Sequence, residues 1–179
     1  MLQEYKKHAE ERSSQGIPAL PLNAEQVAEL VELLKSPPAG EEKFILALIT
    51  NRTPAGVDPA AYVKAAFLTD VAKAEASSPL IDKRLATELL GTMLGGYNVE
   101  SLINLLDDED VGAIAADGLC KTLLMFNAKH DVIELAKKNE NAKRVVESWS
   151  AAEWFTSKPD LPEMIKAIVF RVDGEINTD

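Results

Sequence analysis

The residue types that most often carry out chemistry in proteins are scarce in this chain. It has two histidines, His8 and His130, and one cysteine, Cys120. Neither histidine has a second histidine or a cysteine at metal-site spacing, so we expect surface or helix-capping roles for both. One cysteine forms no disulfide within the chain, and an iron–sulfur cluster needs about three or four thiolates. We therefore predict that Cys120 is a small buried apolar residue.

Two short segments have the look of binding loops. Residues 107–110 (DDED) are acidic, but a calcium loop alternates its ligands around a central glycine and ends on a glutamate. We predict instead a capped helix start. Residues 91–98 (GTMLGGYN) lack the Gly-Lys-Ser/Thr ending of a phosphate-binding loop, which favours a helix end followed by an N-cap. No nucleophile is paired with a base, so we predict no catalytic, cofactor-binding or metal-binding residue in this sequence.

The composition indicates one ordinary domain with a short extra element. The chain has 179 residues, of which 46% are hydrophobic and 27% charged, and its net charge is −10. Such acidity disfavours nucleic-acid binding, which depends on cations meeting phosphates. The basic residues at 137–138 and 143–144 are better interpreted as a solvated helix face. No run approaches the roughly 18 apolar residues of a membrane span, and the charged N-terminus lacks an apolar signal core, so we expect a cytoplasmic protein without a membrane partner.

The elements that would position any site are helices. A polar terminal helix carries His8, and eight further helical patterns follow it. Helix N-caps are predicted at Asn23 (with Gln26 three residues on), Asp58 (before Pro59), Asp82 and Asn98. The last three helices are predicted near residues 111–126, 128–138 and 142–156. Short linkers indicate that neighbouring helices form antiparallel hairpins.

Two of these hairpins match each other at a spacing of 30 residues. The matching positions are Ala86, Leu89, Thr92, Leu94, Leu102, Ile103 and Leu105 with Ala116, Leu119, Thr122, Leu124, Val132, Ile133 and Leu135. A period of this size is typical of stacked helical hairpins. We therefore predict an all-α fold, an irregular HEAT-like array of antiparallel hairpins. Chance is the alternative, because all helical hairpins share apolar spacing.

The pattern changes near the C-terminus. Residues 165–172 (IKAIVFRV) predict a β-strand, and a turn signal follows. A lone strand is not a sheet, so we predict a helical domain over residues 1–160 and the truncated start of a second domain over 161–179. We expect the tail, 164–179, either to pack near Trp149, Trp154 and Phe155 or to pair with a neighbouring copy.

Four segments carry a family resemblance. Residues 33–42 (LLKSPPAGEE), 89–98 (LLGTMLGGYN) and 152–155 (AEWF) resemble the N-terminal part of bacterial aconitase B. Residues 169–179 (VFRVDGEINTD) resemble the entry to its swivelling domain, and also the start of isopropylmalate isomerase small subunits. The resemblance covers essentially the whole chain.

The resemblance implies a HEAT-like domain ahead of a swivelling domain and catalytic domains. The full enzyme would be a lyase of the tricarboxylic acid cycle, an aconitate hydratase and 2-methylisocitrate dehydratase with a [4Fe–4S] cluster. The family's catalytic serine, substrate-binding arginines and cluster cysteines belong to later segments, so none is carried over to this sequence. The helical domain is expected to make protein–protein contacts and to help form the passage to the active site.

Our leading hypothesis is a non-catalytic interaction domain. Its expected partners are later domains of the same chain, other proteins, or a second copy. The alternative is a regulatory RNA-binding module acting through the region from Lys137 to Arg144. A small-molecule pocket between hairpins also stays open, although no convergent polar set points to one.

Overall fold

The computed structural model describes residues 1–122, 125, 128–151, 168–170 and 176–178. The chain divides into two compact units, Met1–Trp149 and Ser150–Asp179. The predicted boundary between residues 160 and 161 lies outside the described residues and stays a prediction. In the described part, the elements are α1 (Leu2–Ser14), α2 (Ala24–Lys35), α3 (Glu42–Asn51), α4 (Pro59–Ala72), α5 (Lys83–Gly91), α6 (Val99–Asn104), α7 (Gly112–Cys120), α8 (Ala128–Leu135), α9 (Glu140–Ser150), β1 (Ile168–Phe170) and β2 (Ile176–Thr178).

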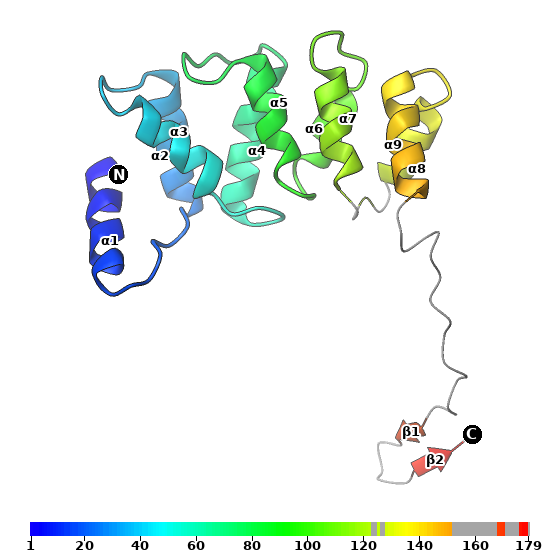
Figure 1. Ribbon diagram of the computed structural model, residues 1–179, viewed down its shortest axis with the longest axis horizontal. Coiled ribbons are helices and arrows are strands. Elements are labelled where there is room, and N and C mark those ends of the chain that lie inside the picture. The colour runs from blue at the N-terminus through cyan, green and yellow to red at the C-terminus, as the bar shows by residue number, and fades with distance from the viewer. Residues whose placement is uncertain (123–124, 126–127, 152–167, 171–175, 179) are drawn as a thin grey trace. The chain divides into compact units, whose positions relative to one another are not determined.

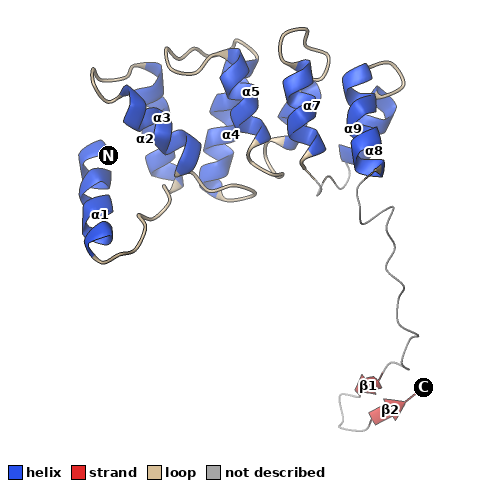
Figure 2. Ribbon diagram, viewed as in Figure 1, coloured by secondary structure: helices blue, strands red, loops and turns tan. Residues whose placement is uncertain are grey.

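The first unit is a succession of packed helices, as predicted (Figures 1 and 2). Helix α2 packs on α3 and α4, α4 on α5, α5 on α6 and α7, and α6 on α7 and α8. Large side chains with less than 2% exposure lie along the whole succession, among them Leu34, Ile49, Leu68, Leu90 and Leu106. The core therefore runs between successive helix layers, which is the arrangement of a helical repeat protein. None of the described helices is long and apolar enough to cross a bilayer.

Three of the four predicted caps are present. Asn23 and Gln26 form a reciprocal capping box, with N···O distances of 2.9 and 3.0 Å. Asp58 accepts from the N–H of Ala60 at 2.8 Å, and Asp82 accepts from the N–H of Leu85 at 2.7 Å. Because each cap satisfies an N–H group that has no partner within its helix, each fixes where its helix begins.

The cap prediction at Asn98 is wrong. The Asn98 side chain is fully buried and makes no cap hydrogen bond. Its Nδ2 donates instead to the carbonyl of Leu90, at 2.7 Å. The side chain thus ties the start of α6 to the end of α5, a contact that local sequence does not encode.

The predicted helix over residues 111–126 is too long, since α7 ends at Cys120. The N–H groups of Lys121 and Thr122 donate three residues back, to Gly118 and Leu119, so the last turn tightens. The hydroxyl of Thr122 also donates to the carbonyl of Gly118, at 3.1 Å. Side-chain competition of this kind disfavours continuation of a helix. Helices α8 and α9 likewise end before the predicted residues 138 and 156, at Leu135 and Ser150.

The matched hairpins are α5 with α6 and α7 with α8. The offset between the starts of α5 and α7 equals that between α6 and α8. Ala86, Leu89 and Leu102 are buried, and so are their counterparts Ala116, Leu119 and Val132. Thr92 and Thr122 differ, because Thr92 is exposed and Thr122 is buried.

In the second unit, β1 and β2 pair antiparallel, with Ile168 opposite Thr178, Val169 opposite Asn177 and Phe170 opposite Ile176. The strand over residues 168–170 lies within the predicted 165–172, whose other residues are outside the described part. The tail strand therefore has a partner within its own chain.

Candidate functional site

The histidines and the cysteine, which could bind metals or take part in catalysis, do not come together in the structure. Nε2 of His8 accepts from the N–H of Leu20 at 3.1 Å, and its ring lies 5.9 Å from that of Tyr5. His130 is exposed on α8, and Cys120 is partly buried at the end of α7. Within the part of the chain that the structure describes, no three His, Cys, Asp or Glu side chains are grouped as metal ligands would be.

The acidic cluster at residues 107–110 lies just before α7, but the predicted side-chain cap is absent, because the N-cap position is Val111 and no side chain caps it. Oδ1 of Asp108 accepts from the N–H groups of Asp110 and Val111, at 3.0 and 3.1 Å. Its Oδ2 lies 2.7 Å from Nζ of Lys83, at the start of α5. The hydrogen bond with Lys83 lowers the pKa of the Asp108 carboxyl, and the same bond raises the pKa of Lys83. The cluster fastens two helix starts together.

Three of the basic residues between positions 137 and 144 are paired with acids. Lys137 pairs with Glu134, and Lys143 pairs with Glu140. Arg144 reaches across to α7, where it pairs with Asp117 at 2.8 Å and donates to the carbonyl of Ala113 at 2.7 Å. The geometry does not gather these cations into a free stripe for phosphates.

Two loops far apart in the sequence pair with each other, residues 52–58 and 92–98, here called the paired loops. The N–H of Gly56 donates to the carbonyl of Met93 at 3.4 Å, and Gly56 forms a parallel bridge with Gly96. A Cβ on Gly96 would lie 2.5 Å from the carbonyl oxygen of Gly56, so only glycine allows this approach. Leu94, in the second of these loops, has a φ of 63°. This left-handed backbone conformation costs a leucine roughly 1–2 kcal/mol.

The paired loops and the start of α4 carry four exposed large apolar side chains, here called the paired-loop patch. Its members and exposures are Val57 (74%), Tyr62 (59%), Leu94 (64%) and Tyr97 (41%). The rings of Tyr62 and Tyr97 meet edge to face at 5.1 Å. In the described part the other exposed large apolar side chains are Ile17 and Leu20, in the loop after α1. An apolar cluster of this kind marks a contact surface more often than an isolated side chain does.

Some buried polar atoms in and after the paired loops have no hydrogen-bond partner among the described residues. The structure gives no hydrogen bond to two buried atoms, Oγ1 of Thr53 and Oδ1 of Asn98. On α4, Lys64 is 3% exposed, and no hydrogen bond or ion pair reaches its Nζ from the described residues. Burial lowers the pKa of Lys64 to about 8.

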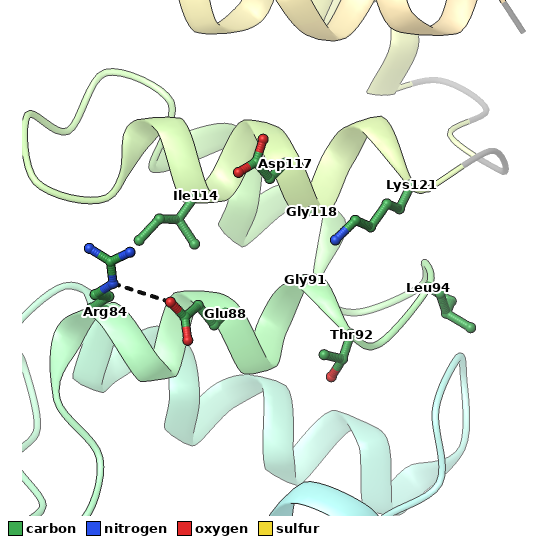
Figure 3. A pocket seen from close by; sticks show the side chains of 9 residues that line it. All are labelled: Arg84, Glu88, Gly91, Thr92, Leu94, Ile114, Asp117, Gly118 and Lys121. Carbon is green, nitrogen blue, oxygen red and sulfur yellow. Dashed lines mark hydrogen bonds and ion pairs between the residues drawn. The ribbon is translucent and has the colours of Figure 1, made fainter.

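A groove adjoins the patch at Leu94 (Figure 3). It has a volume of about 520 Å³ and lies between α5 and α7, where Gly91 and Gly118 meet. Its lining residues are Arg84, Glu88, Gly91, Thr92, Leu94, Ile114, Asp117, Gly118 and Lys121. Arg84 pairs with Glu88 at 3.2 Å, and Asp117 pairs with Arg144. Nζ of Lys121 has no such partner in the described part.

Sequence reasoning missed this surface. Residues 91–98 were predicted to be a helix end followed by an N-cap, and Asp58 was predicted only as the N-cap of the next helix. The only signal in the sequence was that glycines stand next to large apolar residues. Gly56 precedes Val57, and Gly95–Gly96 lie between Leu94 and Tyr97. That signal does not say that the two loops meet.

The sequence is similar to that of a known protein family and to those of several characterised enzymes. The family model described as the aconitate B N-terminal domain matches residues 4–155. Aconitate hydratase B of Pseudomonas aeruginosa is 61% identical over 180 residues, covering 100% of this chain. The Escherichia coli and Helicobacter pylori enzymes of the same name are 58% and 46% identical, over 100% and 99% of the chain. The chain spans 21% of the length of each of these relatives. It therefore belongs to the aconitate B N-terminal domain family.

Proposed function

We propose that this chain is the non-catalytic protein-contact domain of an aconitate hydratase B type enzyme. The parent would interconvert citrate and isocitrate through cis-aconitate and hydrate 2-methyl-cis-aconitate. The relatives' name, aconitate hydratase B, supports the aconitate part of this activity for the parent, and the chain spans 21% of their length. A contact role suits a helical repeat array, which presents broad surfaces to partners.

The observation that carries the contact role is the paired-loop patch. Its side chains are held outward by a glycine-dependent loop pairing and by a left-handed Leu94. A domain that used this region only for its own packing would gain more by burying Leu94 and Tyr62. The strained backbone and the exposed apolar surface occur together, as they do at contact sites.

The cofactor implied by the family does not fit this chain. A [4Fe–4S] cluster needs about three or four thiolates, and the sequence has one cysteine. Cys120 is partly buried at a helix end. The cluster of the parent would therefore be held by residues outside this sequence, and no step of the reaction is assigned to residues 1–179.

The test is an activity measurement on the isolated 1–179 chain. After reconstitution with iron and sulfide, it should hydrate cis-aconitate no faster than buffer. A full-length relative, such as the Escherichia coli enzyme, treated in parallel is the positive control. Turnover by the 1–179 chain above the buffer rate would overturn the proposal.

The geometry gives the RNA-binding alternative little support, because Lys137, Lys143 and Arg144 are paired with acids. A gel shift with RNA across ionic strength tests it directly. If the alternative holds, binding appears at low salt and weakens steeply as salt is added. The absence of a shift at micromolar protein and low salt would remove it.

A further inference from the structure

We propose that the attachment of α1 to the rest of the helical unit is a pH-sensitive switch controlled by His8. The neutral imidazole holds the helix in place through a hydrogen bond to the loop that follows α1, and protonation of the ring releases it. The inference concerns a part of the chain that the proposed function does not use, so either can fail without the other.

Two side chains of α1 hold the same residue of the following loop. Nε2 of His8 accepts from the N–H of Leu20 at 3.1 Å, and the hydroxyl of Tyr5 donates to the carbonyl of Leu20 at 2.8 Å. The two rings lie 5.9 Å apart. Leu20 is therefore held through both of its backbone polar groups.

The hydrogen bond to His8 requires an unprotonated ring nitrogen. A backbone N–H can only donate, so Nε2 has to be the bare nitrogen of a neutral imidazole. In the imidazolium ion both nitrogens carry protons and neither accepts. Proton binding at Nε2 and the bond from Leu20 exclude each other, so acid favours the state in which the bond is broken. Imidazole is the side chain that ordinarily changes charge between about pH 5 and 8.

Helix α1 has only a small share of the hydrophobic core and lies at the N-terminal end of the succession of helices (Figure 1). Of its 13 residues only Tyr5 is buried, and Leu2 is partly buried. Among the described residues, its ion pairs to other elements are Lys6 with Glu41 and, from the N-terminus, Met1 with Glu29. Partly exposed ion pairs of this kind contribute little to stability. A single hydrogen bond is therefore a large part of what holds α1.

The charged side chains that share a face of α1 with His8 already have partners. The carboxylates of Glu4 and Glu11 are paired with cations of the same segment, and Arg12 donates to a carbonyl of the following loop. That loop, residues 15–22, has no titratable side chain. Neither carboxylate is therefore free to hold the protonated ring in place of the lost hydrogen bond.

The neighbouring elements bring two carboxylates and one guanidinium to α1. Glu29 of α2 and Glu41, just before α3, are the partners in its ion pairs. Burial raises the pKa of the Tyr5 hydroxyl, and the charge of Arg52, just after α3, opposes this rise. The hydroxyl stays a donor at neutral and acid pH. Of the two side chains that hold Leu20, only the imidazole therefore changes its hydrogen bonding in acid.

The first experiment measures amide hydrogen exchange in the 1–179 chain at pH 7.5 and at pH 5, with each rate divided by that of an unstructured peptide at the same pH. We expect protection at the N–H of Leu20 and across α1 to fall about tenfold at pH 5, as the loss of one hydrogen bond implies. Protection in α5, inside the succession of helices, should change much less. Equal protection of α1 at the two pH values overturns the inference.

Matched substitutions give the second experiment. His8→Gln keeps an acceptor on a side chain that does not titrate, so the protection of α1 should no longer depend on pH. His8→Lys places a permanent cation without an acceptor there, and should leave α1 at pH 7.5 as weakly protected as it is at pH 5 in the unmodified chain. His130→Gln makes the same change at the exposed histidine of α8 and should keep the full response. A response that persists in His8→Gln assigns the effect to carboxylates such as Glu41 and overturns the inference.

Nuclear magnetic resonance of the imidazole gives a third measurement. At pH 7.5 the nitrogen shifts should show Nε2 of His8 unprotonated, and the midpoint of the ring's titration should coincide with the midpoint at which α1 loses protection. The chain has two histidines, so the spectrum of His8→Gln assigns the signals. If the His8 ring takes up its proton while α1 stays fully protected, the inference is wrong.

Discussion

Among the residues that the structure describes, two other than glycine adopt the left-handed backbone conformation, Ala74 and Leu94, and their surroundings differ. Ala74 has φ of 60° and follows α4 in a Schellman arrangement, in which the N–H of Glu75 donates to Asp70 and that of Ala74 to Val71. Helix termination therefore accounts for its conformation. Leu94 ends no helix, since the C-cap of α5 is Thr92. Its left-handed conformation leaves the Leu94 side chain 64% exposed.

Lys64 is a buried cation whose electrostatics affect the stability of the domain. Burial lowers its pKa from 10.5 to about 8, because the charged form loses hydration without gaining a counter-ion. The native state therefore binds fewer protons than the unfolded chain between about pH 8 and 10.5. The free energy of unfolding is lowered by this group at neutral pH, and that penalty is relieved as the pH rises through the same window.

Replacing Lys64 by methionine tests this account. Lys64→Met keeps the apolar stem and removes the buried charge, so it should raise the free energy of unfolding by about 1–3 kcal/mol at pH 7. Urea unfolding at pH 7 and at pH 10 measures the effect, and the advantage of the variant should shrink at the higher pH. Other titrating groups contribute equally to both proteins, so the difference reports on Lys64 alone. A constant difference, or a loss of stability at pH 7, would contradict the assignment.

At the scale of the elements, sequence predicted those features that depend on near neighbours. Asn23, Asp58 and Asp82 cap their helices through contacts two or three residues away, and all three were predicted. Asn98 bonds a carbonyl in the preceding helix, and Thr122 helps to end α7, so both predictions failed where a competing hydrogen bond decided the outcome. The paired-loop patch depends on Gly56 meeting Gly96 across 40 positions. The spacing of apolar residues predicts helices, but it does not predict which distant loops touch. The fold class could therefore be predicted from the sequence, whereas the candidate site could not.

The crossing of α5 and α7 depends on two glycines. A Cβ on Gly118 would lie 2.8 Å from Cα of Gly91 and 3.2 Å from Cδ1 of Leu102. Side chains at positions 91 and 118 would keep the two helices further apart, so their close approach requires glycine at both. Both glycines also line the adjoining groove.

The variant Gly118→Ala should destabilise the domain by about 1–3 kcal/mol, since the close backbone contact forces the helices apart. This loss should exceed the gain of up to about 1 kcal/mol that alanine brings to a helix interior. Thermal or urea unfolding measures the change. Gly40→Ala gives a comparison without crowding, because no heavy atom lies within 4 Å of the added Cβ, and any loss of stability it causes comes from its left-handed φ of 87°. If Gly118→Ala stabilises the chain, the crossing is looser than described.

At the scale of the whole molecule, α9 closes the helical unit. Trp149 is 8% exposed, and its Nε1 donates to the carbonyl of Leu119 at 3.0 Å. Val145 and Ala142 are fully buried. Nδ2 of Asn141 donates to the carbonyl of Leu106 at 3.0 Å, and Arg144 pairs with Asp117. Of the three aromatic residues near which the tail was expected to pack, Trp154 and Phe155 lie outside the described residues, so that expectation stays a prediction. A terminal layer that covers the previous layer is what a repeat array requires.

Two truncations test whether the unit is complete at α9. A chain of residues 1–151 keeps the contacts of Trp149 with the described residues, so its unfolding midpoint should match that of the 1–179 chain within about 2 °C. A chain of residues 1–139 lacks α9 and exposes Leu119, so it should lose at least roughly 3 kcal/mol, comparable to removing a buried tryptophan. Calorimetry and sedimentation should be measured on both, because the tail was also expected to mediate pairing between copies. A lower midpoint for 1–151, or a change in its oligomeric state, would mean that the tail contributes to the helical unit or to association. Equal stability of 1–139 and 1–151 would mean that α9 is not the closing layer.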